Sequence, residues 1–123
     1  MLKNIAILGS TGSIGTQALE VIRQHPQQFR VSVLTARHNA GLLIRQALEF
    51  HPDAVVIGCK SSYDKLRKAL AGKGIEVFAG KNELDDIAAY PGVDLVLVAL
   101  VGYSGLKPVI NAIDAGKDVA LAN

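Results

Sequence analysis

The sequence contains a single cysteine and no tryptophan, which limits the kinds of site it can build. Cys59 has no partner within the chain for a disulfide, and no cysteines and histidines cluster at the spacing of a metal site. A reducing cytoplasm is therefore the expected location. We expect Cys59 to pack as a small hydrophobic side chain, not to act as a nucleophile.

Long hydrophobic runs and clusters of one charge are absent as well. The longest apolar run, Leu95–Val101, has seven residues, whereas a membrane-spanning helix needs about 20. The formal net charge is +2, and the lysines and arginines do not form the basic stripe of a nucleic-acid-binding face. Neither a membrane nor a nucleic acid is an expected partner. With 50% hydrophobic and 20% charged residues, the 123-residue chain has the composition of one globular domain.

Short apolar runs, typical of buried parallel strands, alternate with segments of helical periodicity along the chain. The runs are Ile5–Leu8, Val31–Leu34, Ala54–Ile57, Ile75–Phe78, Leu95–Leu100 and Val119–Leu121. The alternation predicts an α/β fold of the Rossmann type, a doubly wound, mostly parallel sheet of about six strands with helices on both faces. We place Leu95–Leu100 centrally beside Ile5–Leu8, and Ile75–Phe78 at an edge.

A glycine-rich turn follows the first predicted strand and leads directly into the first predicted helix. Its sequence is Gly9-Ser10-Thr11-Gly12-Ser13-Ile14-Gly15. Gly9 permits a tight turn, Gly12 lets the backbone approach a pyrophosphate, and Gly15 lets the helix pack closely on the strand. Backbone N–H groups and the positive end of the helix dipole then face the phosphates, with the serine and threonine hydroxyls as further donors. The spacing G-x-x-G-x-x-G is not the commoner G-x-G-x-x-G, but the strand before it and the helix after it favour a dinucleotide-binding turn.

The end of the second predicted strand lacks the acidic residue of NAD-specific domains. Asp or Glu usually binds the adenosine ribose hydroxyls at this point, whereas this chain has Thr35-Ala36-Arg37-His38-Asn39. Arg37 and His38 offer positive charge and hydrogen-bond donors, which suit a 2′-phosphate. We therefore expect a preference for NADPH over NADH. The alternative is that Arg37 is a solvated loop residue.

Other polar residues do not form a catalytic constellation. Gly102 follows the strand predicted at Leu95–Leu100, at the edge where ligands bind, and is expected to bring the backbone close to the cofactor. We expect Tyr103 to pack on the surface, and His25 and His51 to cap helix ends. No paired carboxylates mark an acid–base site. Solvent-facing or strand-entry positions are expected for Lys81, Asp85, Asp86 and Asp94.

Further motifs follow the glycine turn along the chain. With Ile5–Gln17 they comprise His25-Pro26, Phe29-Arg30-Val31, Ala36–Asn39, Val101-Gly102, Ser104-Gly105-Leu106, Ala115-Gly116-Lys117 and Leu121-Ala122-Asn123. In order and spacing these motifs resemble the amino-terminal part of the 1-deoxy-D-xylulose 5-phosphate reductoisomerases, over essentially the whole chain. This family reduces and rearranges 1-deoxy-D-xylulose 5-phosphate to 2-C-methyl-D-erythritol 4-phosphate in non-mevalonate isoprenoid biosynthesis. It uses NADPH and a divalent metal, Mg or Mn.

The resemblance implies roles in cofactor binding and assigns no catalytic or metal-binding residue to this chain. The implied contacts are the pyrophosphate region with Thr11, Gly12, Ser13 and Ile14, the adenosine phosphate end with Arg37, His38 and Asn39, and the nicotinamide side with Asn123, with Gly102 as an additional contact. Many family members carry glycine and then a small or basic residue where this chain has Arg37-His38. Contacts at the 2′-phosphate are therefore expected to differ in detail.

The resemblance also implies a longer enzyme. We expect residues 1–123 to form the NADPH-binding domain, because the family continues after the Leu-Ala-Asn motif with a Lys-Glu pair and then with metal-binding and C-terminal domains. This chain alone is expected to be inactive, and the whole enzyme to bind a phosphosugar and to form a homodimer. Two other hypotheses stay open. One is the NADPH domain of another reductase, of the dihydrodipicolinate reductase or homoserine dehydrogenase type, and the other is a nucleotide-sensing module without catalysis.

Overall fold

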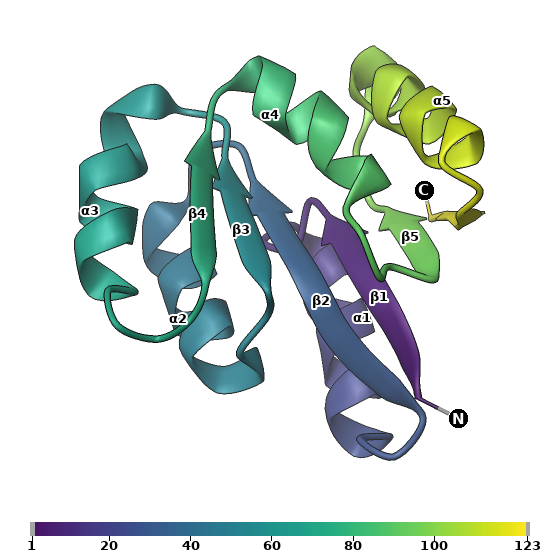
Figure 1. Cartoon of the computed structure of the whole chain (residues 1–123), viewed down its shortest axis with the longest axis horizontal. Helices are drawn as coiled ribbons and strands as arrows, with labels where there is room; N and C mark the ends of the chain where they lie inside the picture. The colour runs from purple at the N-terminus through teal and green to yellow at the C-terminus, as the bar shows by residue number, and fades with distance from the viewer. Residues whose placement is uncertain (1, 123) are drawn as a thin grey trace.

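The computed structural model describes residues 2–122, with Gly102 and Tyr103 described by their backbone only, and contains one sheet covered by helices (Figure 1). The strands are β1 (Lys3–Leu8), β2 (Phe29–Ala36), β3 (Ala54–Ile57), β4 (Glu76–Ala79), β5 (Leu95–Val98) and β6 (Asp118–Leu121). The α-helices are α1 (Ser13–Gln24), α2 (Ala40–Phe50), α3 (Tyr63–Ala69), α4 (Lys81–Asp86) and α5 (Leu106–Asp114). Short 3₁₀ helices are η1 (Lys60–Ser62), η2 (Ile87–Ala89) and η3 (Gly102–Gly105). None of the helices within residues 2–122 is long and apolar enough to cross a membrane.

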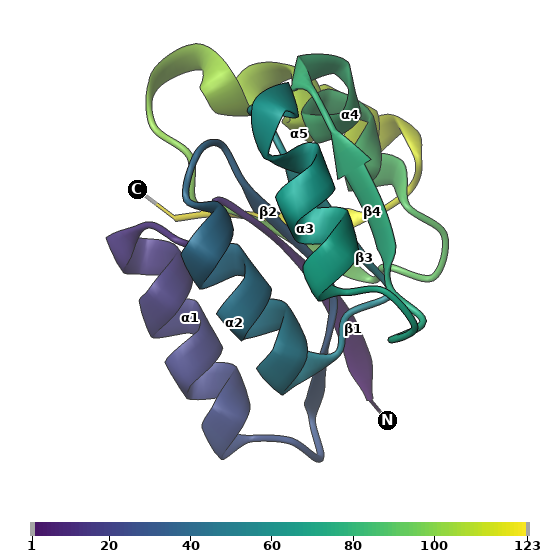
Figure 2. The same ribbon diagram turned by 90° about the vertical axis from the view of Figure 1, so that its left-hand side faces the viewer.

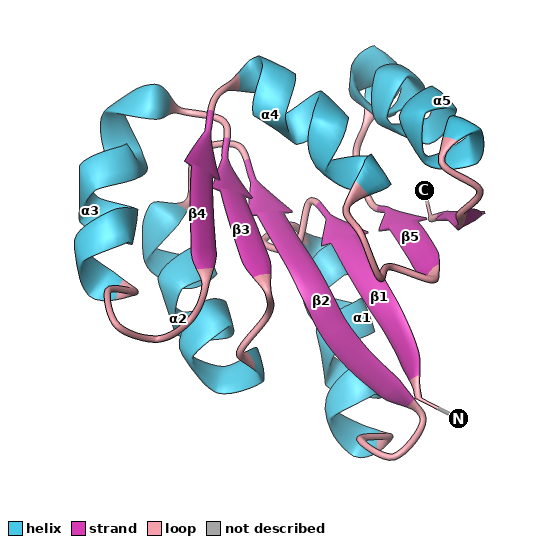
Figure 3. Cartoon of the chain, viewed as in Figure 1, coloured by secondary structure: helices cyan, strands magenta, loops and turns pink. Residues whose placement is uncertain are grey.

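The six strands lie in the order β4-β3-β2-β1-β5-β6, and every neighbouring pair is parallel. The predicted places of β5 beside β1 and of β4 at an edge are confirmed. Strand order reverses between β1 and β5, so the chain leaves these two strands in opposite directions. A crevice for ligands forms at such a reversal, outside the carboxyl ends of the strands. Figure 3 shows the turns that follow β1 and β2 at this edge.

Helices cover both faces of the sheet, as the sequence predicts. Residues of α1, α2 and α3 pack with one set of strand side chains, and η2 and α5 pack with the other set. Figure 2 shows α1 and α2 side by side on one face and α4 and α5 on the other. This double cover explains why the inner strands β1, β2 and β3 contain apolar runs, since most of their residues are buried on both faces.

Four strands differ in length from the sequence prediction: β1, β2 and β6 are longer than their apolar runs, and β5 is shorter. β2 begins at Phe29, two residues before the predicted run, because Phe29 and Arg30 pair with the start of β1, and it continues two residues beyond the run to Ala36. β5 ends at Val98, two residues earlier than predicted, although the N–H of Ala99 still donates to the carbonyl oxygen of Leu8 at 2.9 Å. Because β5 ends early, the chain leaves the sheet and continues into η3 at the carboxyl edge.

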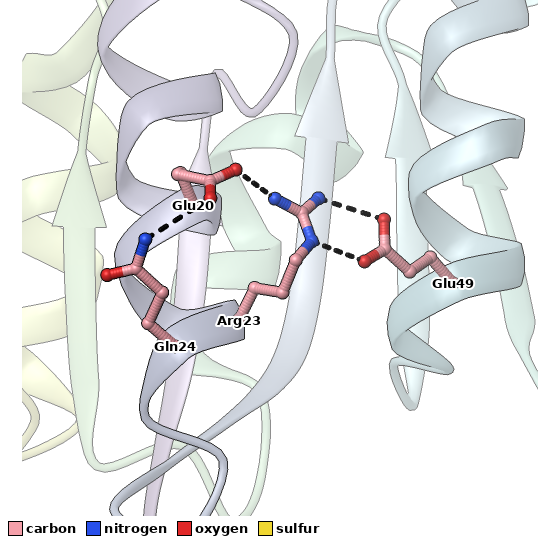
Figure 4. Close-up of polar contacts among 4 residues, drawn as sticks. All are labelled: Glu20, Arg23, Gln24 and Glu49. Atoms are coloured by element: carbon pink, nitrogen blue, oxygen red, sulfur yellow. Dashed lines mark hydrogen bonds and ion pairs between the residues drawn. The ribbon is translucent and has the colours of Figure 1, made fainter.

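The outer surfaces of α1 and α2 are joined by an ion-pair network (Figure 4). The Arg23 guanidinium donates to both carboxylate oxygens of Glu49, at 2.6 and 2.9 Å, and also to Glu20. It lies 5.3 Å from the centre of the Phe50 ring. The hydrogen bonds from Arg23 lower the pKa of Glu49. The network fixes the two helices that begin at the carboxyl edge, but it is exposed and therefore screened by salt.

A second ion pair ties β2 to the start of β3. The Arg30 guanidinium donates to the two oxygens of Asp53 at 2.8 and 2.9 Å, and the Ser32 hydroxyl donates to Asp53 Oδ2 at 3.0 Å. The hydrogen bonds from Arg30, followed by that from Ser32, hold the pKa of Asp53 below its ordinary value of 3.8, against the opposing effect of partial burial. The charged form of Asp53 is thus favoured in the folded state.

We predict that Asp53→Asn removes an acid-sensitive part of the free energy of unfolding. A depressed pKa stabilises the fold above the unfolded-state pKa, and this contribution is lost as the pH falls below about 4 through the folded-state pKa. Because Asp53 is partly exposed, the contribution at pH 7 should be no more than about 1 kcal/mol. Urea unfolding at several pH values measures it, and equal pH dependence in both proteins would contradict the assignment.

Candidate cofactor-binding site

Each of the three positions in the turn after β1 is glycine for a different reason. Gly9 has a φ of +87°, and a Cβ atom there would lie 2.8 Å from the carbonyl oxygen of Ala99. A Cβ atom on Gly15 would lie 2.7 Å from the Cα of Ser10, so only glycine allows α1 to pack against the turn. Gly12 has a φ of −77°, and a Cβ atom there would meet nothing closer than 3.8 Å. Gly9 and Gly15 are therefore required by the fold, whereas Gly12 leaves open space in front of the turn.

The amino-terminal end of α1 offers free hydrogen-bond donors toward that space. The helical ladder begins with the Thr16 N–H, which donates to the Gly12 carbonyl oxygen at 2.9 Å. No acceptor among the described residues pairs with the N–H groups of Ser13 and Ile14, and Gly12 provides no side-chain cap. Ser13 and Ile14 are exposed. Unpaired N–H groups at the positive end of a helix dipole form a site for phosphate.

The turn is fixed from behind by a buried polar network around Ser10. The Ser10 hydroxyl donates to Gln46 Oε1 at 2.7 Å, and Gln46 Nε2 donates back to the Ser10 carbonyl oxygen at 2.9 Å. The Ser10 N–H donates to the Thr35 carbonyl oxygen at 2.8 Å, and the Gly9 N–H donates to Thr35 Oγ1 at 3.1 Å. The expectation that the Ser10 hydroxyl faces the phosphates is wrong, because this residue is fully buried and its hydroxyl is used within the protein.

Sequence reasoning missed Gln46, which is 6% exposed. The signal that could have found it is its position in α2, three residues after Leu43 and one before Ala47, on the stripe that α2 buries. A polar residue on a buried stripe needs a hydrogen-bond partner, and here that partner is the glycine turn.

The residues expected at the adenosine end follow β2 at the same edge of the sheet. Arg37, His38 and Asn39 are all exposed. Arg37 is not merely solvated, since its Nη2 donates to the Ser104 hydroxyl at 3.2 Å and so links the end of β2 to η3. Asn39 caps α2, with its Oδ1 accepting from the Leu42 N–H at 3.1 Å.

The two remaining expected contacts, Asn123 at the nicotinamide side and Gly102 close to the cofactor, are described less fully. The backbone of Gly102 begins η3, in the segment that Arg37 reaches through Ser104. Asn123 lies outside the described residues. The structure thus brings the turn after β1, the end of β2 and η3 to one edge, which the sequence predicted from the strand order.

A cavity of about 290 Å³ opens between the ends of β1 and β2 and the helices α4 and α5. Its lining combines apolar side chains with three cations and one carboxylate, from Leu8, Thr35, Ala36, Arg37, Lys81, Leu84, Asp85, Leu100, Ser104, Lys107 and Pro108. Asp85 was expected to face solvent, and this is wrong: it is 5% exposed. α4 turns Asp85 inward, where its Oδ2 lies 3.3 Å from Lys81 Nζ.

A cluster of metal ligands does not accompany this cavity in the described part of the chain. Within residues 2–122, no three His, Cys, Asp or Glu side chains lie close enough to hold a metal ion. Cys59 is half-buried, not core filler, with its Sγ 3.0 Å from the Ser61 hydroxyl. Hydrogen bonds with Ser61 lower the pKa of the Cys59 thiol. The arrangement can hold an anionic nucleotide, and the described residues contribute no cluster of metal ligands to it.

Comparisons with known proteins agree on one family. The family model of 1-deoxy-D-xylulose 5-phosphate reductoisomerase matches residues 5–123. The reductoisomerase of Phocaeicola vulgatus is 52% identical over 123 residues, which are 100% of this chain and 32% of the relative. That of Bacteroides fragilis is 54% identical over 121 residues, or 98% of this chain and 31% of the relative. The chain therefore spans about a third of the length of these curated relatives.

Solved structures give the same result. The Zymomonas mobilis reductoisomerase in complex with NADPH matches all of this chain and 32% of its own, at 37% identity and a TM-score of 0.92. A reductoisomerase in complex with NADPH, fosmidomycin and magnesium matches 98% of this chain and 30% of its own, at 38% identity and a TM-score of 0.91. The alternative of a dihydrodipicolinate reductase or homoserine dehydrogenase is not supported by these matches. This chain belongs to the 1-deoxy-D-xylulose 5-phosphate reductoisomerase family.

Proposed function

We propose that residues 1–123 are the NADPH-binding domain of an enzyme that converts 1-deoxy-D-xylulose 5-phosphate to 2-C-methyl-D-erythritol 4-phosphate in non-mevalonate isoprenoid biosynthesis. The observation that carries the proposal is the open space at Gly12. This space adjoins the unpaired N–H groups at the start of α1, at the point where the strand order reverses between β1 and β5. A pyrophosphate there accepts hydrogen bonds that the protein itself does not provide. A solved relative bound to NADPH supports the same cofactor here.

The residues of this chain fit the two charged parts of NADPH. We assign the pyrophosphate to Thr11, Gly12, Ser13 and Ile14, the adenosine phosphate end to Arg37, His38 and Asn39, and the nicotinamide side to Asn123, with Gly102 as an additional contact. Arg37 supports the choice of NADPH, because no carboxylate stands at the end of β2 to bind an unphosphorylated ribose. The apolar lining of the neighbouring cavity suits the adenine ring.

In this proposal the chain binds and orients the cofactor, which supplies a hydride when bound. The turn fixes the pyrophosphate at one end of β1, and Arg37 fixes the adenosine end, so the nicotinamide is directed along the carboxyl edge of the sheet. Holding the reactive group in one orientation lowers the entropic cost of the reaction. Substrate binding and the divalent metal, Mg or Mn, we assign to parts of the enzyme beyond these residues, as supported by a relative's complex with fosmidomycin and magnesium.

The phosphosugar substrate, a homodimeric assembly and a cytoplasmic location complete the proposal for the whole enzyme. They rest on membership of the family, of which this chain spans about a third. No observation within residues 2–122 favours the alternative of a nucleotide-sensing module without catalysis.

We predict that the chain binds NADPH at least about tenfold more tightly than NADH, because Arg37 gains a charge-assisted contact only with the 2′-phosphate. Arg37→Asp should reverse the preference, since a carboxylate binds the ribose hydroxyls of NADH. Ser104→Ala is the matched control, because it removes the same Arg37–Ser104 hydrogen bond and keeps the charge. Calorimetric titration measures the affinity of each of the three proteins for both cofactors, and equal binding of NADPH and NADH by the unaltered chain would refute the assignment.

Gly12→Val should abolish NADPH binding while the fold persists, because the branched side chain would fill the space of the pyrophosphate without straining a negative φ. Gly15→Ala is the contrasting variant. It should lower the melting temperature as well, since its Cβ meets the backbone of the turn. Circular dichroism and cofactor titration distinguish the two. Retained binding in Gly12→Val would place the pyrophosphate elsewhere.

The chain of 123 residues should not turn over 1-deoxy-D-xylulose 5-phosphate, even with NADPH and a divalent metal in excess. Metal catalysis needs clustered oxygen ligands, and residues 2–122 contain no such cluster. The absorbance of NADPH, followed with substrate and metal present and with each omitted, measures turnover. Oxidation that depends on both would show that the chain holds a complete active site.

A further inference from the structure

Arg37 alone does not account for the positive charge of the cavity that opens between the ends of β1 and β2 and the helices α4 and α5. Three cations line it, Arg37, Lys81 and Lys107, against the single carboxylate of Asp85. Lys81 and Asp85 form an ion pair within α4, at 3.3 Å, so their charges offset one another. The remaining excess of positive charge belongs to Arg37 and Lys107. A cavity with such an excess favours an anion.

The fold directs Lys107 toward this cavity from the helix opposite Arg37. Lys107 lies one turn before Asn111 in α5, so the two residues share a helix face. Asn111 faces α4, because its Nδ2 donates to the carbonyl oxygen of Asp85 at 2.8 Å. The same contact fixes the distance between α4 and α5, which together form one wall of the cavity. Lys107 is exposed, and its amine is free to approach a ligand at the cavity mouth.

Arg37 approaches the same place from the end of β2. Its hydrogen bond to Ser104 brings the guanidinium to η3, three residues before Lys107. Two cations from segments about 70 residues apart in sequence therefore line one cavity, Arg37 after β2 and Lys107 in the first turn of α5. The amino-terminal end of that helix adds to the positive potential.

We propose that Lys107 is a second binding residue for the 2′-phosphate of NADPH and shares it with Arg37 across the mouth of the cavity. The inference rests on the proposed function, since it concerns the adenosine end of the same cofactor. Lys107 thereby sets the preference for a phosphorylated ribose together with Arg37, while the Lys81–Asp85 pair serves as a neutral wall. A point charge on a flexible stem complements the planar guanidinium, because the two approach different oxygens of one phosphate.

The test uses Lys107→Met and four probes: NADPH, NADH, adenosine 2′,5′-bisphosphate and adenosine 5′-monophosphate. The variant should bind NADPH and the bisphosphate about tenfold more weakly, and NADH and the monophosphate within twofold of the unaltered chain. Lys107→Arg should restore most of the loss. The matched control is Lys65→Met, which removes the same charge from the exposed surface of α3 and should change no affinity more than twofold. Raising the salt concentration should reduce the difference in NADPH affinity between Lys107→Met and the unaltered chain, because salt screens the attraction between Lys107 and the phosphate.

The outcomes separate this inference from the function on which it rests. If Lys107→Met weakens all four probes equally, or weakens none, Lys107 does not bind the 2′-phosphate and the inference fails, while the NADPH site stands. If the unaltered chain binds neither NADPH nor NADH, the proposed function fails and the inference with it. Thermal unfolding of each variant shows whether a uniform loss arises from the fold.

Discussion

The buried hydrogen-bond network around Ser10 determines the shape of the candidate site. It joins three elements, because Ser10 bonds to Gln46 of α2 and to the Thr35 carbonyl oxygen of β2 while it forms part of the turn after β1. Each such bond contributes about 1 kcal/mol, but removing one partner leaves a buried polar group unsatisfied, at a cost of about 1–3 kcal/mol. Within the described residues every buried side-chain polar atom has a partner. The turn is therefore rigid before any ligand arrives.

This network also couples the two ends of the proposed cofactor site. Thr35 holds the turn through its carbonyl oxygen and hydroxyl, and Arg37 lies two residues further along the same strand end. The proposed pyrophosphate donors and the cation proposed for the adenosine end are thus held close to one another, because only two residues separate Thr35 from Arg37. Preorganisation of this kind reduces the ordering cost of binding a long, flexible dinucleotide.

The glycines of the turn, and the burial of Asp85, distinguish residues that the fold requires from residues that are available to a ligand. Gly9 and Gly15 are needed for close packing of backbone, so they would be required even in a protein that bound nothing. Gly12 has an ordinary φ and open space beside it, so its lack of a side chain has no structural reason in this chain and points to a ligand. Likewise Asp85 is buried beside Lys81, which leaves the exposed cations at the cavity mouth to meet an anion.

The sequence by itself determined the α/β class, the strand order around β1 and the position of the glycine turn. These features follow from local patterns: apolar runs, helical periodicity and glycine spacing each express a constraint that acts over a few residues. Only the tertiary structure decided that the Ser10 hydroxyl points inward, that Gln46 supports the turn, and that Asp85 is buried. It also brought Lys107 to the cavity that Arg37 lines. Such pairings join residues that are distant in the chain, and they depend on how helices pack across the sheet, which no local pattern specifies.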